Sequence, residues 1–268
     1  MVTVLLKYGA EKEAVSIHWE SPLHHAAQSG HSDVVRVLLE SKADKETETP
    51  DGTTPLFVAS QNGHTDVVTV LLEYGAETET KTHDGVTPLF IASQNGHTDV
   101  VTVLLESGAD RETKTPDGTT PLFISAHNGH ADVVRVLLEC GAEKETQTPS
   151  RSSPFFIASQ NGHTDVSKVL LECGSETDTF PEKTSVYPTG QPNVVPVLSE
   201  HGAKETERDD GTTLLDRASL KGQATVVRHG LDRERRAVYG VSASQFSTSP
   251  RCHSLLTHSL TATLHEGF

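Results

Sequence analysis

A repeat of 33 residues dominates the sequence and limits what the chain can fold into. The segment 51–83, DGTTPLFVASQNGHTDVVTVLLEYGAETETKTH, is followed at once by 84–116, DGVTPLFIASQNGHTDVVTVLLESGADRETKTP, and the two differ at six of 33 positions. A unit this short cannot bury its apolar residues without a neighbour. Self-similarity at this period therefore predicts a stack of units rather than a closed globule.

Each unit carries the start and stop signals of two helices. Thr54 can cap a helix whose first residue is Pro55, and Gly63 ends that helix. A second helix is expected to start near Thr65 and Asp66, because a hydroxyl and an acid suit a helix N-terminus. Its apolar residues recur at helical spacing, at Val67, Val68, Leu71 and Leu72. The polar segment AETETKTHDG follows and contains a favoured tight-turn pair, so each unit reads as helix, turn, helix and extended turn.

The period divides the chain into an array over 1–239 and a tail. Residues 1–17 match the back half of a unit, so we expect the chain to be a fragment or to have a misplaced start. After residue 180 the register degrades, which leaves two degenerate units before a Ser- and Thr-rich tail at 240–268 that is predicted to be disordered. The five full units are 18–50, 51–83, 84–116, 117–149 and 150–182, and the degenerate ones are 183–209 and 210–239.

The repeated unit resembles the ankyrin repeat over residues 1–239. The resemblance is carried by the DG and TPL motifs, Ala59-Ser60, Gly63-His64, the VVxVLL helix and Gly75-Ala76. It implies an all-α fold, a solenoid of stacked helix-turn-helix units with extended turn or hairpin fingers. The family's TPLH is kept only as SPLH at 21–24. Aromatic packing is expected to replace the hydrogen bonds of that histidine at Phe57, Phe90, Phe123 and Phe156.

The charge of the chain is strongly acidic and argues against two classes of partner. The net charge is −15, which disfavours nucleic acid and anionic membrane surfaces. No apolar run approaches the roughly 18 residues of a membrane span, and the start MVTVLLKYGAEKE is too short and too acidic for a signal peptide. The chain is expected to be a soluble, cytoplasmic monomer, with the nucleus as the alternative location.

Histidine and cysteine recur at fixed positions of the units. Helices of adjacent units pack at about 10 Å, whereas metal ligands lie about 2 Å from one ion and disulfides need Cα atoms within about 7 Å. We therefore expect free thiols at Cys140 and Cys173, no shared metal, no cofactor, and histidines that bridge one unit to the next. The repeated His-Asp pair also lacks a nucleophile and a pocket, so no catalysis is expected. The histidine positions are His31, His64, His97, His130 and His163.

Two acidic rows run through the polar segments. The favoured interpretation is a solvated face, because basic residues are interleaved with the acids, and the alternative is attraction of a basic peptide. One row is Glu13, Glu46, Glu79, Glu112, Glu145 and Asp178, and the other is Glu11, Asp44, Glu77, Asp110, Glu143 and Glu176. The interleaved bases are Lys12, Lys45, Arg111 and Lys144.

The resemblance implies a non-catalytic protein-interaction module, a scaffold or adaptor that binds a protein or peptide of basic character through its concave face and turn tips. Because the contact positions vary little, we expect them to bind an extended or repetitive segment. Alternatively, the array is a spacer or targeting arm of a larger enzyme, channel or adaptor. The predicted contact residues are Gln28, Ser29, Thr53, Gln61, Asn62, His83, Val86, Gln94, Asn95, Thr119, His127, Asn128, Ser152, Gln160 and Asn161.

Overall fold

The computed structural model describes residues 1–145, 148 and 152–175. The chain divides into two units, Met1–Leu214 and Leu215–Phe268, and every described residue belongs to the first. The predicted degenerate units at 183–209 and 210–239 and the predicted tail at 240–268 lie outside the described residues. So do the last members of the two acidic rows, Asp178 and Glu176.

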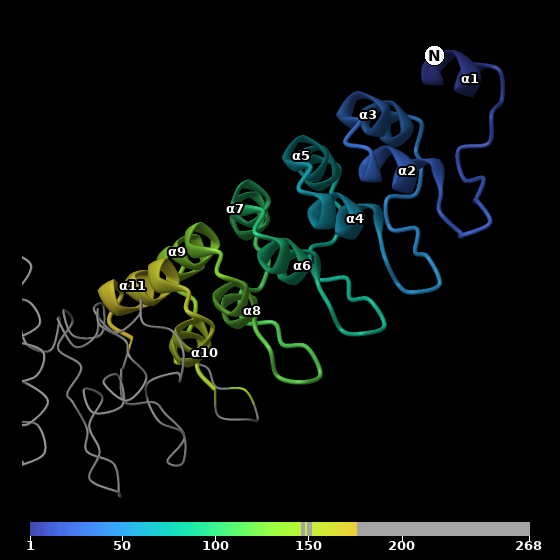
Figure 1. The fold of residues 1–268 in the computed structure, drawn as a ribbon. Helices are drawn as coiled ribbons and strands as arrows, with labels where there is room; N and C mark the ends of the chain where they lie inside the picture. Colours follow the sequence, from blue (N-terminus) through green and yellow to red (C-terminus); the bar gives the residue numbers. More distant parts are fainter. Residues whose placement is uncertain (146–147, 149–151, 176–268) are drawn as a thin grey trace, which may run out of the picture. The chain divides into compact units, whose positions relative to one another are not determined.

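Helix pairs follow one another at the period of the sequence (Figure 1), and the regular elements of the described residues are all α-helices. A single helix, α1 (Val2–Lys7), precedes the pairs. Each first helix contacts the first helices of its neighbours, and each second helix contacts the second helices, which confirms the predicted solenoid. The pairs are α2 (Pro22–Gln28) with α3 (Ser32–Glu40), α4 (Pro55–Asn62) with α5 (Thr65–Glu73), α6 (Pro88–Asn95) with α7 (Thr98–Glu106), α8 (Pro121–Asn128) with α9 (Ala131–Glu139), and α10 (Pro154–Asn161) with α11 (Thr164–Glu172).

The first helices begin and end as the sequence predicts. At α4, the Thr54 hydroxyl accepts a hydrogen bond from the Phe57 N–H at 3.2 Å, and Pro55 occupies the first helical position. Gly63 ends the helix with φ 74°, a left-handed conformation that costs other residues about 1–2 kcal/mol. Thr87, Thr120 and Ser153 cap the following first helices in the same way.

The core lies between the row of first helices and the row of second helices. Val67, Val68 and Leu71 of α5 are fully buried, as predicted. Leu72 is only half-buried, and Val70 is buried in its place. Successive helical residues are rotated by about 100°, so the two neighbours of Leu71 lie on opposite flanks of α5.

The structure confirms that phenylalanine packing replaces the hydrogen bonds of the histidine in the TPLH motif. His24 is buried, its Nδ1 pairs with the Ser21 hydroxyl at 2.9 Å, and its Nε2–H donates to the Thr53 carbonyl at 3.0 Å. Burial lowers the pKa of His24, against the opposing effect of the Thr53 carbonyl. In the later units these bonds are replaced by phenylalanine packing, with Phe57, Phe90 and Phe156 buried and Phe123 half-buried.

Candidate binding surface

The loops between the two helices of each unit are tied to one another by histidine. His97 Nε2–H donates to the Gln61 carbonyl of the preceding unit at 3.0 Å, and His64 donates to the Gln28 carbonyl at 2.9 Å. His130 and His163 repeat the bond to the carbonyls of Gln94 and His127. The predicted bridging role is confirmed for His64, His97, His130 and His163, whereas the described residues show no such bond for His31.

Each bridging histidine ring lies against the glycine that ends the previous first helix. A Cβ added at Gly63 would lie 2.6 Å from His97 Nδ1, and one at Gly96 would lie 2.6 Å from His130 Nδ1. Glycine is therefore required at this position for two reasons: its backbone is left-handed, and the histidine ring fills the space that a Cβ would occupy. The glycine of one unit and the histidine of the next thus form a contact between units.

The predicted asparagine contacts are mostly used inside the molecule. The Asn95 side-chain amide donates to the Gln61 carbonyl at 2.9 Å, and Asn128 donates to the Gln94 carbonyl at 2.8 Å. Asn161 does the same to His127, while Asn62 donates to Val58 of its own helix. These amide donors stabilise the stack, which reduces what they can offer to a partner.

The side chains at the glutamine positions, in contrast, are not used in contacts between the described units. Gln28, Gln61 and Gln160 are exposed and Gln94 is half-buried. Within the described ranges, the side-chain amides of these glutamines make no hydrogen bond, although two of their backbone carbonyls receive both a histidine and an asparagine. In the fourth full unit the position is His127, exposed and paired through Nδ1 with the Asn128 side chain at 2.8 Å. Ser29, next to Gln28, is also exposed.

The predicted finger residues differ in how much of them a partner can reach. His83 is exposed, and Thr53, Val86 and Ser152 are half-buried. Thr119 is buried, with 7% of its surface exposed, so it contributes little to a contact surface. The carbonyl at this position closes the finger by accepting a backbone N–H from four residues earlier, as Thr119 does from Thr115 at 3.1 Å. This backbone bond ties the residue to the base of the finger, away from its tip.

A row of aliphatic residues lies one helical turn before the glutamines and was missed by sequence reasoning. Spacing of three places both rows on the same side of each first helix, and this spacing was the signal that could have revealed them. The aliphatic side chains are half-buried, at Val58, Ile91, Ile124 and Ile157. We call these residues, together with Gln61, Gln94, His127 and Gln160, the first-helix stripe.

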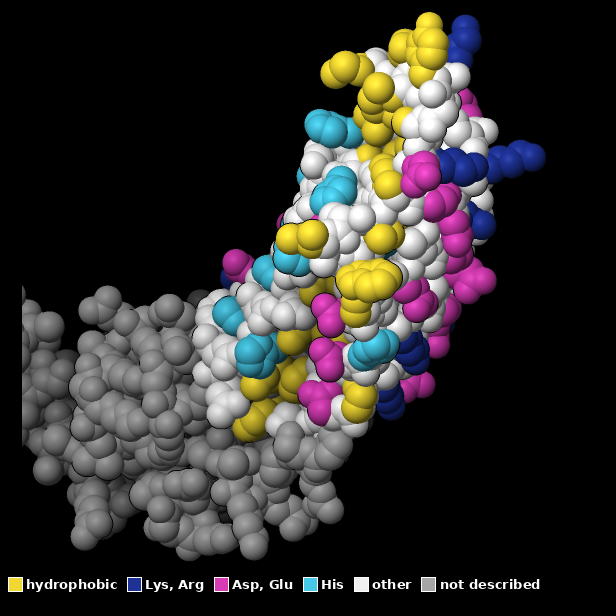
Figure 2. Space-filling view, turned by 90° about the vertical axis from the view of Figure 1, so that its right-hand side faces the viewer, with side chains coloured by type: hydrophobic (Ala, Val, Ile, Leu, Met, Phe, Trp, Pro, Cys, Tyr) yellow, Lys and Arg dark blue, Asp and Glu magenta, His cyan; other side chains and the backbone are white. Residues whose placement is uncertain are grey.

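The first helices of the five full units contain no Asp, Glu, Lys or Arg. Figure 2 shows most of the histidines along one edge of the face that it presents, hydrophobic patches inside that edge with some acidic side chains beside them, and further acidic and basic side chains toward the opposite edge. The charge of the protein is thus carried by other segments of each unit.

One of the two acidic rows holds neighbouring units together. Glu79 Oε1 accepts the backbone N–H of Asp110 in the next unit at 2.9 Å, and its other oxygen accepts the Thr113 hydroxyl at 3.2 Å. Glu13, Glu46 and Glu112 make the same backbone bond at 2.8–3.0 Å. Burial raises the pKa of Glu46. This row is therefore structural, which the favoured interpretation of a solvated face did not foresee.

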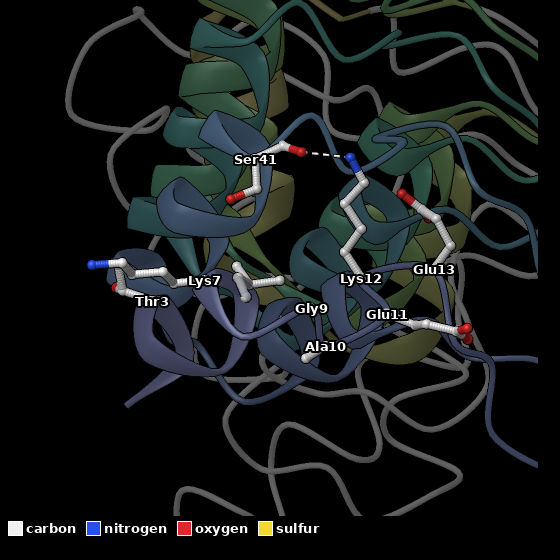
Figure 3. A pocket seen from close by; sticks show the side chains of 9 residues that line it. Thr3, Lys7, Gly9, Ala10, Glu11, Lys12, Glu13 and Ser41 are labelled. Carbon is white, nitrogen blue, oxygen red and sulfur yellow. Dashed lines mark hydrogen bonds between the residues drawn. The ribbon is translucent and has the colours of Figure 1, made fainter.

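Two of the interleaved bases, Lys12 and Lys144, cap helices of the following unit. Lys144 Nζ donates to the carbonyls of Cys173 and Gly174 at 2.8 Å, at the end of α11. Lys12 reaches the carbonyls of Ser41 and Lys42 in the same way at the end of α3 (Figure 3). A cation at a helix C-terminus offsets the unpaired carbonyls and the helix dipole.

The pocket beside Lys12 is explained by the same contact. It has a volume of about 750 Å³ and lies between α1 and Ser41. Figure 3 shows the Lys12 amine bound to the Ser41 carbonyl at the edge of the pocket, and the nearby Glu13 carboxylate accepts the backbone N–H of Asp44. These two side chains of the pocket therefore hold two units together.

Metal clusters and membrane spans are both missing from the described part of the chain. No cluster there has three or more His, Cys, Asp or Glu side chains placed to hold a metal ion. None of the helices in these ranges combines the length and hydropathy that a membrane span requires. Cys140 and Cys173 are free cysteines, and both are exposed.

Stacked helix pairs, tied loops and fingers define the protein as a helical repeat array. The family model described as ankyrin repeats (3 copies) matches residues 1–82, 23–115 and 89–181, so the chain belongs to the ankyrin-repeat family. No curated protein matches the chain. Ankyrin repeats generally mediate protein–protein interactions, and domains built from them are typically non-catalytic.

Proposed function

We propose that this array is a monomeric scaffold or adaptor module that binds a protein or peptide through the exposed side of its first helices and its finger tips. The proposal rests on a difference between neighbouring polar side chains near the end of each first helix. Histidine and asparagine are used within the stack, whereas the neighbouring glutamine amides are not. A polar row that the fold does not need is available to a partner.

Rigid positioning supports the same role. The backbone carbonyl of Gln61 accepts from both Asn95 and His97, so the residue that presents the free amide is fixed at its main chain. Gln94 is held equally by Asn128 and His130. A surface that is already ordered before binding loses less conformational entropy on association.

Basic character in the partner is proposed only for the part that lies over the acidic segments. Glu77, Asp110 and Glu143 of the second acidic row are exposed, and their side chains belong to the segments that lead to the fingers. A lysine or arginine of the partner near these acids would mainly speed association and orient the partner, and would add less to the affinity. We place the module in the cytoplasm, since exposed free thiols such as Cys140 and Cys173 suit a reducing compartment.

A spacer or targeting arm remains the second candidate function. The contacts between units favour it, because histidine, asparagine, glutamate and lysine all join consecutive units in a regular manner. In this alternative, the array sets a distance and the glutamine row has no partner.

Capture with matched surface variants separates the two candidates. The array is immobilised, and bound proteins are compared between the wild type, a Gln61→Ala and Gln94→Ala double variant, and a control with Glu106→Gln and Glu139→Gln on the second helices. Binding through the glutamine row predicts loss of the same captured proteins in the first variant and retention in the control, with unchanged circular dichroism. Capture that is identical in all three proteins would refute the assigned surface and favour the spacer.

A further inference from the structure

The first-helix stripe is uncharged in a protein with 37 acidic and 22 basic residues. None of these charged residues lies in the first helices α4, α6, α8 and α10. A lysine or glutamate of a partner, if buried against the stripe, would lose its hydration without meeting an opposite charge on these helices. The stripe therefore favours a segment of the partner that is itself uncharged.

Each unit presents the same pair of chemical groups along the stripe. The aliphatic side chain, such as Ile91, is half-buried and offers apolar surface. The glutamine one turn later, such as Gln94, offers two N–H donors and one acceptor oxygen that no described residue uses. A partner that matches the stripe supplies, for every unit, one apolar side chain and one exposed peptide group.

The spacing of the units selects the conformation of such a partner. The first helices of adjacent units contact one another, and packed helices lie about 8–10 Å apart. A polyproline II segment rises about 3.1 Å per residue with three residues per turn, so every third side chain lies on the same side, about 9.3 Å from the last. A β-strand repeats its facing side chains every second residue, about 6.6–6.8 Å apart, and does not match.

The hydrogen-bonding state of the partner points the same way. A polyproline II segment has no internal hydrogen bonds, so its backbone carbonyls are available. The side-chain N–H groups of Gln61, Gln94 and Gln160 can donate to those carbonyls, and His127 takes the same position in the unit of α8 and α9. Each contact is weak, but four linked contacts, one for each unit, give a much higher overall affinity than any one of them.

We infer that the first-helix stripe binds an extended, uncharged polyproline II segment with an apolar side chain at every third residue, one for each unit. This inference rests on the proposed function, because it assigns the partner class of the same surface. It differs from that proposal in fixing the charge, the conformation and the register of the partner.

Peptides of equal composition test the register. The probes are two fluorescently labelled twelve-residue peptides with capped ends. One has four Leu-Ser-Pro triplets, and the other has the same residues with leucine at positions 1, 3, 5 and 7. Fluorescence anisotropy with the full chain should show about tenfold tighter binding of the triplet peptide, and a triplet peptide with lysine in place of serine should bind more weakly. Equal binding of the two isomers, or no binding of either, would overturn the inference.

Variants of the array test the assigned surface. Ile91→Asp, which places a charge in the stripe, should abolish binding of the triplet peptide, and Gln61→Ala with Gln94→Ala should weaken it several-fold. Glu106→Gln, on a second helix, should leave it unchanged. Peptide binding that survives Ile91→Asp in a chain with native circular dichroism would also overturn the inference.

The outcome distinguishes the inference from the proposed function. If the glutamine double variant loses captured proteins but the peptide isomers bind equally, the protein-binding role stands and the register is wrong. If capture is unaffected by the glutamine substitutions, the proposed function itself is wrong.

Discussion

Two regions of each unit hold the stack together, and they do so with different chemistry. Where the first helix of each unit ends and the second begins, the bonds between units come from neutral groups, such as His97 and Asn95 donating to Gln61. Near the fingers they come from charged groups, such as Glu79 accepting from Asp110. The difference shows how one repeat can be acidic and still have an uncharged surface. Neutral contacts leave the first-helix stripe uncharged, while the charged residues lie in other segments of each unit.

The largest effect is expected in the core that both regions share. Leu104 is fully buried, so Leu104→Ala should lower the free energy of unfolding by about 2–5 kcal/mol. Leu105→Ala is the control, because Leu105 on the same helix is only half-buried and should cost less. Chemical denaturation followed by circular dichroism measures both. Equal losses would mean that the core has been assigned to the wrong side of α7.

The neutral loop contact is tested by a pair of glycines. Gly63 and Gly108 both have positive φ, at 74° and 92°, so alanine at either position incurs about 1–2 kcal/mol of backbone strain. Only at Gly63 would the new Cβ also meet a ring, 2.6 Å from His97 Nδ1, whereas nothing lies within 4 Å at Gly108. Gly63→Ala should therefore destabilise the protein more than Gly108→Ala in urea unfolding. If the two variants unfold at the same midpoint, the ring contact contributes nothing.

The charged finger contact should depend on salt. Glu79→Ala removes bonds to Asp110 and Thr113 and should cost about 1 kcal/mol. Glu77→Ala removes an exposed acid from the other row and should change stability by less than about 0.5 kcal/mol. The cost of Glu79→Ala should shrink as salt rises toward about 1 M, because screening weakens exposed charged contacts. A cost that is the same at all salt concentrations would contradict the charged character of this contact.

His24 of α2 makes a neutral contact with the finger residue Thr53, and it should make stability depend on pH. Its pKa is lowered by burial, so the folded chain holds it neutral while the unfolded chain takes up a proton below about pH 6.5. The free energy of unfolding should therefore fall as the pH drops through this value. His24→Phe, which copies the later units, should lose this part of the pH dependence. Parallel stability curves for the two proteins between about pH 7.5 and 5.5 would show that His24 does not contribute.

The smallest effect is expected from adding a charged contact where one unit lacks it. Lys144 caps the end of α11, but Thr78 occupies the equivalent position before α7, and nothing lies within 4 Å of a Cβ at Gly108. Thr78→Lys should raise the free energy of unfolding by about 0.3–1 kcal/mol through the carbonyls that end α7. Thr78→Glu is the matched control and should lower it. A melting temperature that moves the same way in both variants would rule out this electrostatic explanation.

Local signals in the sequence predicted the fold well. Thr54, Pro55 and Gly63 mark α4 because caps and left-handed glycines act within a few residues. The bridging histidines followed from comparing the distance between neighbouring helices with the reach of a metal ligand. Such features depend on one unit or on the spacing of two.

The site was harder to predict because exposure and pairing depend on where two units meet. Nothing local shows that the amide of Asn95 is used in the stack whereas that of Gln94 is not. The burial of Thr119 and the acceptor role of Glu79 likewise follow from the closed finger and its neighbour. A periodic sequence shows which residues are equivalent, but only the contacts between units show which of them are left over.

The residues that bond between units are separated by about one period of the sequence, which bears on how the number of units can change. Lys144 to Cys173 spans 29 residues, Glu79 to Asp110 spans 31, and Asn95 to Gln61 spans 34. All are close to one period, and the histidine and glutamate contacts recur from unit to unit. Unequal recombination that inserts or deletes 33 residues, wherever it begins, therefore returns these donors and acceptors to equivalent partners. The array can grow or shrink by whole units without any new interface having to evolve.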